Sequence, residues 1–258
     1  SLSLDGLSDL VGSEVDMAEH MTLEQLQFQE RVHTGSSWTK NEQFDKDGYI
    51  VVKDLWDPEE LIVPVPEMRG QMNYWGKKED QFSFDPLEGQ VEGSLACYTR
   101  PQYRHIHIGI RQKLEKVIGR KLYNTYYYDR FYFAGQGLSL HADRPACEIS
   151  VSVHISTNLE ECWPLWIKTP DTYSEPKNRG EIVESGEKRS VCLNPGDGMI
   201  YKGCERPHWR EPLVSRHTGD YLIRKLGHKD DTFYHQVFFH YVLSDGERSH
   251  CANDMAKE

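Results

Sequence analysis

Three side chains in two distant stretches of the sequence have the types and the spacing of a metal site. His141 and Asp143 lie two residues apart at the end of a predicted strand, Leu138–Asp143. Because side chains alternate along a strand, both point to the same face. An imidazole from a separate strand, which we assign to His208, would complete a set of two histidines and one carboxylate. Such a set suits Fe(II) and leaves coordination positions open for oxygen or a substrate.

The third ligand has to be chosen from several histidines in the last part of the chain. His208 follows a Pro-Gly-Asp-Gly turn and the predicted strand Met199–Lys202. The competing histidines lie in a charged loop or on a late strand; they are His217, His228, His235 and His240. We expect His208 to be the ligand, and the alternative is that it is an ordinary loop residue.

The elements that must position these residues are mostly short strands. One helix is predicted over Ile106–Ile118, because isoleucine and leucine recur there at helical spacing and Gly119 follows. After this helix, apolar and aromatic runs are separated by Gly, Asn and Pro turns. The predicted strands are Leu122–Tyr128, Arg130–Ala134, Leu138–Asp143, Ile149–Ile155, Trp163–Ile167, Arg189–Leu193, Met199–Lys202 and Tyr234–Val242.

The first third of the chain is predicted to be helical and irregular. Thr22 has the character of a helix N-cap, residues 48–52 form a predicted strand, and Asp57-Pro58 starts a second helix. Residues 64–100 are rich in Pro, Gly and aromatic side chains and are expected to be irregular. Helices followed by many short strands predict an α+β, mainly β fold: a double-stranded β-helix (jelly-roll) barrel with flanking helices from the N-terminal third.

The composition narrows the classes of function. The chain has 258 residues and a net charge of −11, which disfavours a nucleic-acid partner because phosphate binding needs a cationic surface. The sequence contains no long apolar run, so we expect no membrane partner. We expect residues 1–20 to be a flexible acidic leader and residues 21–258 to form a single domain.

The cysteines bear on the compartment. They lack the paired CxxC spacing, and no secretory leader is visible, so we predict reduced thiols in a soluble, cytoplasmic protein. An extracellular set of disulfides is the alternative, although such frameworks suit much shorter chains. The cysteines are Cys97, Cys147, Cys162, Cys192, Cys204 and Cys251.

Three stretches, taken in order, resemble those of a known enzyme family. Residues 132–143 (YFAGQGLSLHAD) are similar to the metal-binding strand of the Fe(II)/2-oxoglutarate-dependent dioxygenases, closest to the prolyl-4-hydroxylase-like branch. Residues 194–201 resemble the family's Pro-Gly-Asp turn and the strand that leads to its distal histidine. Residues 44–52 are similar to the start of many members. The resemblance spans roughly residues 40 to 245, with the motifs in the family's order.

The resemblance implies an activity and a set of cofactors. His141, Asp143 and His208 would be the catalytic and metal residues that hold Fe(II). 2-Oxoglutarate and O2 would be cosubstrates, with ascorbate in support, and 2-oxoglutarate would be converted to succinate and CO2 while a C–H bond is hydroxylated. The substrate would be a small molecule or an amino-acid or peptidyl side chain. In such enzymes the cofactors perform the difficult steps, and the protein orients and shields them.

The distal carboxylate of 2-oxoglutarate requires a cation, and here the chain departs from the family. In the prolyl-hydroxylase-like branch that cation opens the strand after the distal histidine, whereas no Arg or Lys opens the strand from Tyr234. Arg210 and Arg216 are the candidates; we favour Arg210, because two residues after His208 on a continued strand it would face the same interior. Tyr132 matches a tyrosine whose hydroxyl lines the cosubstrate site.

A metal-dependent cupin that does not use 2-oxoglutarate is the alternative enzyme. The first cupin motif has a glycine, an HxH pair and a glutamate at a similar spacing, although an aspartate here replaces the second histidine. The matching residues are Gly135, His141, Asp143 and Glu148. A non-catalytic binding module of the same fold is a further alternative, but a buried His/Asp cluster without a metal would be costly.

Two other features near the predicted triad have chemical potential. Cys147 and Cys204 lie close in sequence to the histidines and could suggest zinc, but they lack paired spacing, and a closed thiolate site would not be catalytic. Arg144 follows Asp143 directly and is expected to contact an anionic substrate or to brace the metal strand.

Overall fold

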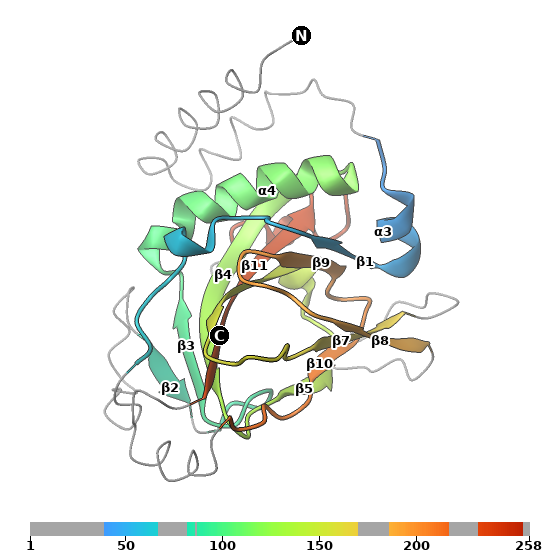
Figure 1. The fold of residues 1–258 in the computed structure, drawn as a ribbon. Helices are drawn as coiled ribbons and strands as arrows, with labels where there is room; N and C mark the ends of the chain where they lie inside the picture. The colour runs from blue at the N-terminus through green and yellow to red at the C-terminus, as the bar shows by residue number, and fades with distance from the viewer. Residues whose placement is uncertain (1–38, 67–81, 86, 170–185, 217–231, 255–258) are drawn as a thin grey trace.

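The computed structural model places the metal motifs inside a two-sheet barrel (Figure 1). The predicted leader and the helix start at Thr22 lie outside the residues that the structure describes, so both remain predictions, as does the single domain. The described residues are 39–66, 82–85, 87–169, 186–216 and 232–254.

Two antiparallel sheets form the barrel, which confirms the predicted jelly-roll fold. The larger sheet has the strand order β1-β9-β6-β11-β4-β3-β2, and the smaller has the order β5-β10-β7-β8. The larger sheet consists of β1 (Tyr49–Val52), β9 (Gly198–Lys202), β6 (Ile149–Thr157), β11 (Phe233–Leu243), β4 (Leu122–Phe133), β3 (Ser94–Tyr98) and β2 (Ser83–Asp85). The smaller sheet consists of β5 (Leu138–His141), β10 (His208–Arg210), β7 (Leu165–Thr169) and β8 (Glu187–Val191).

One long helix covers the outer face of the larger sheet. This helix, α4 (Arg104–Ile118), lies across β4 and β11 in Figure 1. Its apolar residues at i, i+4 and i+8 pack against the valines and aromatic residues on the outward face of β6 and β11. Gly119 ends the helix in the left-handed conformation with φ of 69°, as its position in the sequence predicts. A short helix, α3 (Glu42–Asp47), precedes β1.

The inner face of the larger sheet is unusually polar. Along β6, Val151 and Val153 face the outer core, whereas Ser150, Ser152 and His154 alternate with them and are also buried. β11 repeats this pattern, because buried Gln236 and His240 alternate with outward-facing apolar residues. Buried polar groups need partners, so their concentration on one face marks a site rather than a packed core.

The structure differs from the sequence prediction in several elements. The two predicted strands from Leu122 and Arg130 are one continuous strand, β4, because both edges of that segment pair with neighbours. The segment from 64 to 100, expected to be irregular, contains β2 and β3, which extend the larger sheet. The predicted helix after Asp57 is a single 3-10 turn, Pro58–Glu60. Two further 3-10 turns are Pro101–Tyr103, just before α4, and Pro145–Cys147, just after Asp143.

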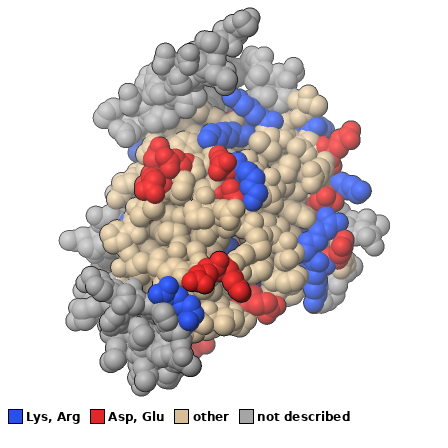
Figure 2. Space-filling view, viewed as in Figure 1, with Lys and Arg blue, Asp and Glu red and all other residues tan. Residues whose placement is uncertain are grey.

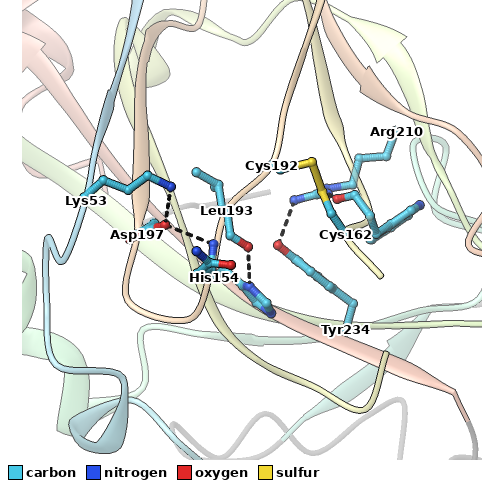
Figure 3. The surroundings of a disulfide bond; sticks show 10 residues. Lys53, His154, Cys162, Cys192, Leu193, Asp197, Arg210 and Tyr234 are labelled. Carbon is cyan, nitrogen blue, oxygen red and sulfur yellow. Dashed lines mark hydrogen bonds and ion pairs between the residues drawn. A yellow bond between two sulfur atoms is a disulfide. The ribbon is translucent and has the colours of Figure 1, made fainter. Parts of the chain in front are cut away.

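The prediction that all cysteines are reduced is wrong for two of them. Cys162 and Cys192 form a disulfide with a Cα–Cα distance of 5.8 Å (Figure 3). The two residues are 30 apart in sequence and belong to segments that precede β7 and follow β8, which pair side by side. The remaining four cysteines, all in the described part of the chain, are not in disulfides, and three of these are buried.

The surface carries charges of both signs. On the face drawn in Figure 2, basic and acidic side chains lie interspersed, with wide uncharged areas between them. Among the described residues, no helix is long and apolar enough to cross a membrane.

Candidate active site

His141, Asp143 and His208 come together at one end of the barrel. The Nε2 atoms of His141 and His208 lie 3.3 and 3.4 Å from the same carboxylate oxygen of Asp143, and the two imidazole centroids are 4.4 Å apart. Each residue offers one atom to a common point, so the three form a group that could hold a metal ion. His208 is buried, whereas His141 and Asp143 are partly exposed, which leaves one side of the group open.

Strand pairing brings the three residues together. His141 at the end of β5 is the direct partner of His208 at the start of β10. Asp143 lies in the turn after β5, where its amide donates to the Gly203 carbonyl at 2.9 Å. A side chain on Gly203 would collide with the Asp143 carboxylate, so only glycine lets this turn approach so closely.

Backbone carbonyls orient the two imidazoles. The Nδ1 of His141 lies 2.7 Å from the Ser139 carbonyl, and the Nδ1 of His208 lies 2.9 Å from the Arg206 carbonyl. A carbonyl can only accept, so Nδ1 carries the proton in each ring. The Nε2 lone pairs are therefore free for a metal, which is the outer support that metal-binding histidines commonly have.

The electrostatics of the group favour a bound cation. Burial acts to raise the pKa of Asp143, but the charge of His208 and hydrogen bonds from both imidazoles bring that pKa well below its usual value. Burial acts to lower the pKa of His208, but the Asp143 carboxylate raises it above its usual value. The Ser150 hydroxyl lies 3.3 Å from the second oxygen of Asp143 and holds the carboxylate in place. Without a metal the Asp143 carboxylate thus favours a protonated His208, and a bound cation would take the place of that proton between the His208 Nε2 and the carboxylate.

The competing histidines lie elsewhere where the structure describes them. His235 is on the outward face of β11, where its Nε2 lies 2.8 Å from the Asp129 carboxylate. His240 contacts the Ser150 hydroxyl through Nδ1 at 2.8 Å, and it forms with Asp143 and Cys147 a second group whose ligand atoms lie within 4.8 Å of one another but which contains one histidine instead of two. His217 and His228 lie outside the described residues. The geometry therefore favours the set with His208.

The residues behind the zinc and cupin alternatives take up other positions. Glu148 accepts from the Leu243 amide and pairs with Arg248, pointing away from the three-residue group. Cys204 donates to the Arg144 carbonyl at 3.2 Å. Cys147 lies within 4.8 Å of Asp143 and His240 ligand atoms, but it also contacts the Tyr126 hydroxyl at 3.2 Å.

Arg210 lies inside the barrel close to the metal group. It follows His208 by two residues on β10 and is only 2% exposed. Its Nη1 donates to the Trp163 carbonyl at 2.6 Å and its Nη2 to the Gln236 amide oxygen at 2.5 Å. Its guanidinium stacks between the rings of Trp163 and Tyr234, at 4.5 and 4.6 Å from their centroids. Among the described residues no carboxylate pairs with it.

Several polar atoms around Arg210 have no hydrogen-bond partner in the described part of the chain. They are the Nε of Arg210, the Tyr132 hydroxyl and the Gln236 amide nitrogen. Tyr132 lies directly opposite Tyr234 in the β4–β11 pairing. Since a buried polar group without a partner is costly, these atoms mark a place for a polar ligand. Arg216, in contrast, is exposed and donates to the Asn158 carbonyl at 3.0 Å.

Comparison with solved structures assigns the fold. AviO1 from Streptomyces viridochromogenes Tue57 aligns with 80% of this chain and 94% of its own, with a TM-score of 0.52 and 14% identity. HygX from Streptomyces hygroscopicus, solved with nickel, 2-oxoglutarate and hygromycin B, aligns with 80% of this chain and 88% of its own, with a TM-score of 0.50 and 11% identity. The chain has the fold of the 2-oxoglutarate oxygenases. The predicted resemblance is thereby confirmed at the level of the fold.

A prolyl-4-hydroxylase from Pseudomonas putida also matches, covering 77% of this chain and 95% of its own at 11% identity, with a TM-score of 0.45. No protein-family model and no curated protein matches the chain.

Sequence reasoning missed two side chains and one backbone carbonyl that contribute to the site. Ser150, which holds Asp143, and Gln236, which contacts Arg210, both occupy inward positions on strands whose outward face is mainly apolar. The polar residue at every second position of such strands is the feature that could have indicated them. The Trp163 carbonyl, in contrast, is a backbone group, and no residue type predicts its role.

Proposed function

We propose that this protein is an Fe(II)- and 2-oxoglutarate-dependent oxygenase that hydroxylates a C–H bond of a small molecule or of an amino-acid or peptidyl side chain. One observation carries this proposal: His141, Asp143 and His208 converge on one point, and the buried Arg210 follows His208 by two residues. The two imidazoles and the carboxylate would hold Fe(II). When bound, the metal and 2-oxoglutarate supply the oxidation of a C–H bond by O2, with release of succinate and CO2.

The positions of the residues suit a five-carbon dicarboxylate. Two residues along a strand advance about 6.6 Å, so one carboxylate can reach the metal while the other reaches Arg210 on the same strand. The free Nε of Arg210 and the Tyr132 hydroxyl would donate to that distal carboxylate. Trp163 and Tyr234 exclude water from the guanidinium, which strengthens its attraction for an anion.

The first experiment measures succinate formation from 2-oxoglutarate by the purified chain with Fe(II), O2 and ascorbate. We expect slow turnover without a second substrate, and loss of both turnover and metal binding in His141→Ala and Asp143→Ala. His250→Ala is the matched control, because His250 is exposed. If the metal-loaded wild type consumes no 2-oxoglutarate, the proposal is refuted and a cupin or a non-catalytic module is favoured.

The second experiment assigns the cosubstrate cation. Arg210→Lys keeps a charge but loses the planar donors, so we expect 2-oxoglutarate to bind about 10- to 100-fold more weakly, equivalent to about 1.5–3 kcal/mol for charged hydrogen bonds. Arg216→Lys is the control and should bind as the wild type does. An unchanged affinity in Arg210→Lys would move the role to another residue.

The compartment is a separate matter. The predicted cytoplasmic location is not supported by the cysteines, since the Cys162–Cys192 disulfide is a bond typical of oxidising compartments. We therefore propose that the protein works in an oxidising environment. Thiol titration of the protein isolated from its native cells, under conditions that block exchange, tests this.

A further inference from the structure

A second buried arginine faces the barrel interior with unused donors. Arg130 on β4 is only 2% exposed, and its Nε and Nη1 have no hydrogen-bond partner in the described part of the chain. Among the described residues, its one ion pair joins Nη2 to the Glu88 carboxylate at 3.4 Å, which is long for a charged hydrogen bond. That carboxylate already accepts from the amides of Gln90 and Val91 in its own loop.

Arg130 lies between the two parts of the proposed site. It alternates along β4 with Tyr128 and Tyr132, so all three share the inner face, and its guanidinium lies 5.3 and 5.7 Å from those two rings. Tyr132 contacts Trp163, which flanks the proposed 2-oxoglutarate cation. In the other direction Tyr128 stacks on Tyr126, whose hydroxyl contacts the loop after Asp143.

An aromatic stack connects Arg130 with the surface. The Tyr128 ring is 4.8 Å from Tyr98, which is partly exposed, and 4.7 Å from Phe238 on β11. The stacked rings run from solvent to the buried guanidinium. They offer an apolar wall to a flat or hydrocarbon group whose charged end would reach Arg130.

The charges of the proposed complex leave Arg130 without a strong partner. Fe(II) with Asp143, the two carboxylates of 2-oxoglutarate and the Arg210 guanidinium sum to zero, so the cosubstrate needs no second cation. Glu88 is a weak counter-ion for Arg130, because its side chain is 25% exposed and solvent screens it. A buried cation with two free donor nitrogens is suited to an oxyanion that comes with another molecule.

We infer that Arg130 binds an oxyanion of the substrate, a carboxylate or a phosphate, and that the substrate carries an apolar group which packs on Tyr128. That the bound molecule is a substrate rests on the proposed oxygenase function, whereas the existence of the anion site does not. Arg130 thereby sets specificity for acidic molecules and orients them between the metal and the open side of the barrel.

The test is calorimetric titration of the full chain loaded with Mn(II) and saturating 2-oxoglutarate. The probes are phenylacetate for the carboxylate and inorganic phosphate for the phosphate source. We expect the wild type to bind one of them, and Arg130→Gln to bind it about 10- to 100-fold more weakly. Arg189→Gln, at a partly exposed position on β8, is the control and should not change the affinity.

The outcomes separate this site from the proposed function. Wild type that binds neither probe, or Arg130→Gln that binds as wild type does, overturns the inference. Should Arg130→Gln fail to fold, Arg130→Lys provides the measurement, because it removes the planar pair of donors. Weaker binding of the probe that the wild type binds supports the anion site, and unchanged binding of that probe overturns it. Wild type that binds a probe but no 2-oxoglutarate keeps the anion site and refutes the oxygenase proposal.

Discussion

Replacing both cysteines of the disulfide is expected to destabilise the protein by an amount that the loop length sets. Cys162 and Cys192 close a loop of 30 residues, and the chain-entropy relation for a loop of that length gives about 3.6 kcal/mol at 25 °C. Since domains are commonly stable by only about 5–15 kcal/mol, this is a large share of the total. At about 2–4 °C per kcal/mol, Tm of Cys162→Ser/Cys192→Ser should fall by about 7–14 °C.

The same substitution is expected to affect the cosubstrate site. Figure 3 shows the disulfide beside Arg210, Tyr234 and His154. Cys162 directly precedes Trp163, whose carbonyl accepts from Arg210, and Cys192 directly precedes Leu193, whose carbonyl accepts from the His154 ring at 2.8 Å. Loosening the two segments would weaken one charged hydrogen bond of Arg210, so 2-oxoglutarate should bind up to about 10-fold more weakly.

The assay is urea unfolding of wild type and variant, each with and without dithiothreitol, followed by 2-oxoglutarate titration. Cys251→Ser is the matched control, because Cys251 is a free cysteine of intermediate exposure. Dithiothreitol should lower the stability of the wild type toward that of the double variant and leave the double variant unchanged. Equal unfolding midpoints for wild type and double variant would refute the reasoning.

Three further predictions concern other parts of the fold. Burial lowers the pKa of His107 to about 3, so the unfolded chain takes up a proton near pH 6.5 that the folded chain does not. The contribution of His107 to the free energy of unfolding is therefore complete above pH 6.5 and falls by about 1.4 kcal/mol per pH unit below it. Urea unfolding at pH 7 and pH 5 should show a smaller loss of stability for His107→Gln than for the wild type. Gly203→Ala should abolish metal binding, measured as metal per chain, with little loss of secondary structure by circular dichroism, because the added methyl displaces Asp143. Asp129→Asn should cost about 3–5 kcal/mol in urea unfolding, because it leaves buried Arg100 without its carboxylate.

The local parts of the fold could be predicted from the sequence. Helix α4 follows from apolar spacing and a terminal glycine, which are properties of one segment. The sequence predicts His141 and Asp143 on one strand, but β5 ends at His141. Asp143 lies in the following turn, where its amide donates to the Gly203 carbonyl and its carboxylate comes to 3.3 Å from the His141 Nε2. His208 could be chosen because a Pro-Gly-Asp turn precedes its strand, and the structure brings it to the other two.

The parts that depend on distant partners could not be predicted. The disulfide joins two cysteines with no characteristic spacing, and only the pairing of β7 with β8 brings them together. β10 has three residues, too few for a pattern to reveal it. Arg130 resembles any other arginine in sequence, and its burial with two unused nitrogens follows from the loop at Glu88 and the neighbouring strands.

The outward face of the larger sheet forms the apolar core and its inward face bears the polar residues of the site. This division explains how the barrel tolerates so polar an interior. The outward face packs valines, isoleucines and aromatic residues against α4, and apolar burial of this kind contributes about 25 cal/mol per Å². The inward face uses the same strands to present Ser150, Gln236 and Arg130, each of which costs stability until it is paired. Because alternate residues belong to different faces, a change of ligand specificity on the inner face leaves the outer core intact. Substitutions at inward positions should therefore alter binding more than folding, and substitutions at outward positions the reverse.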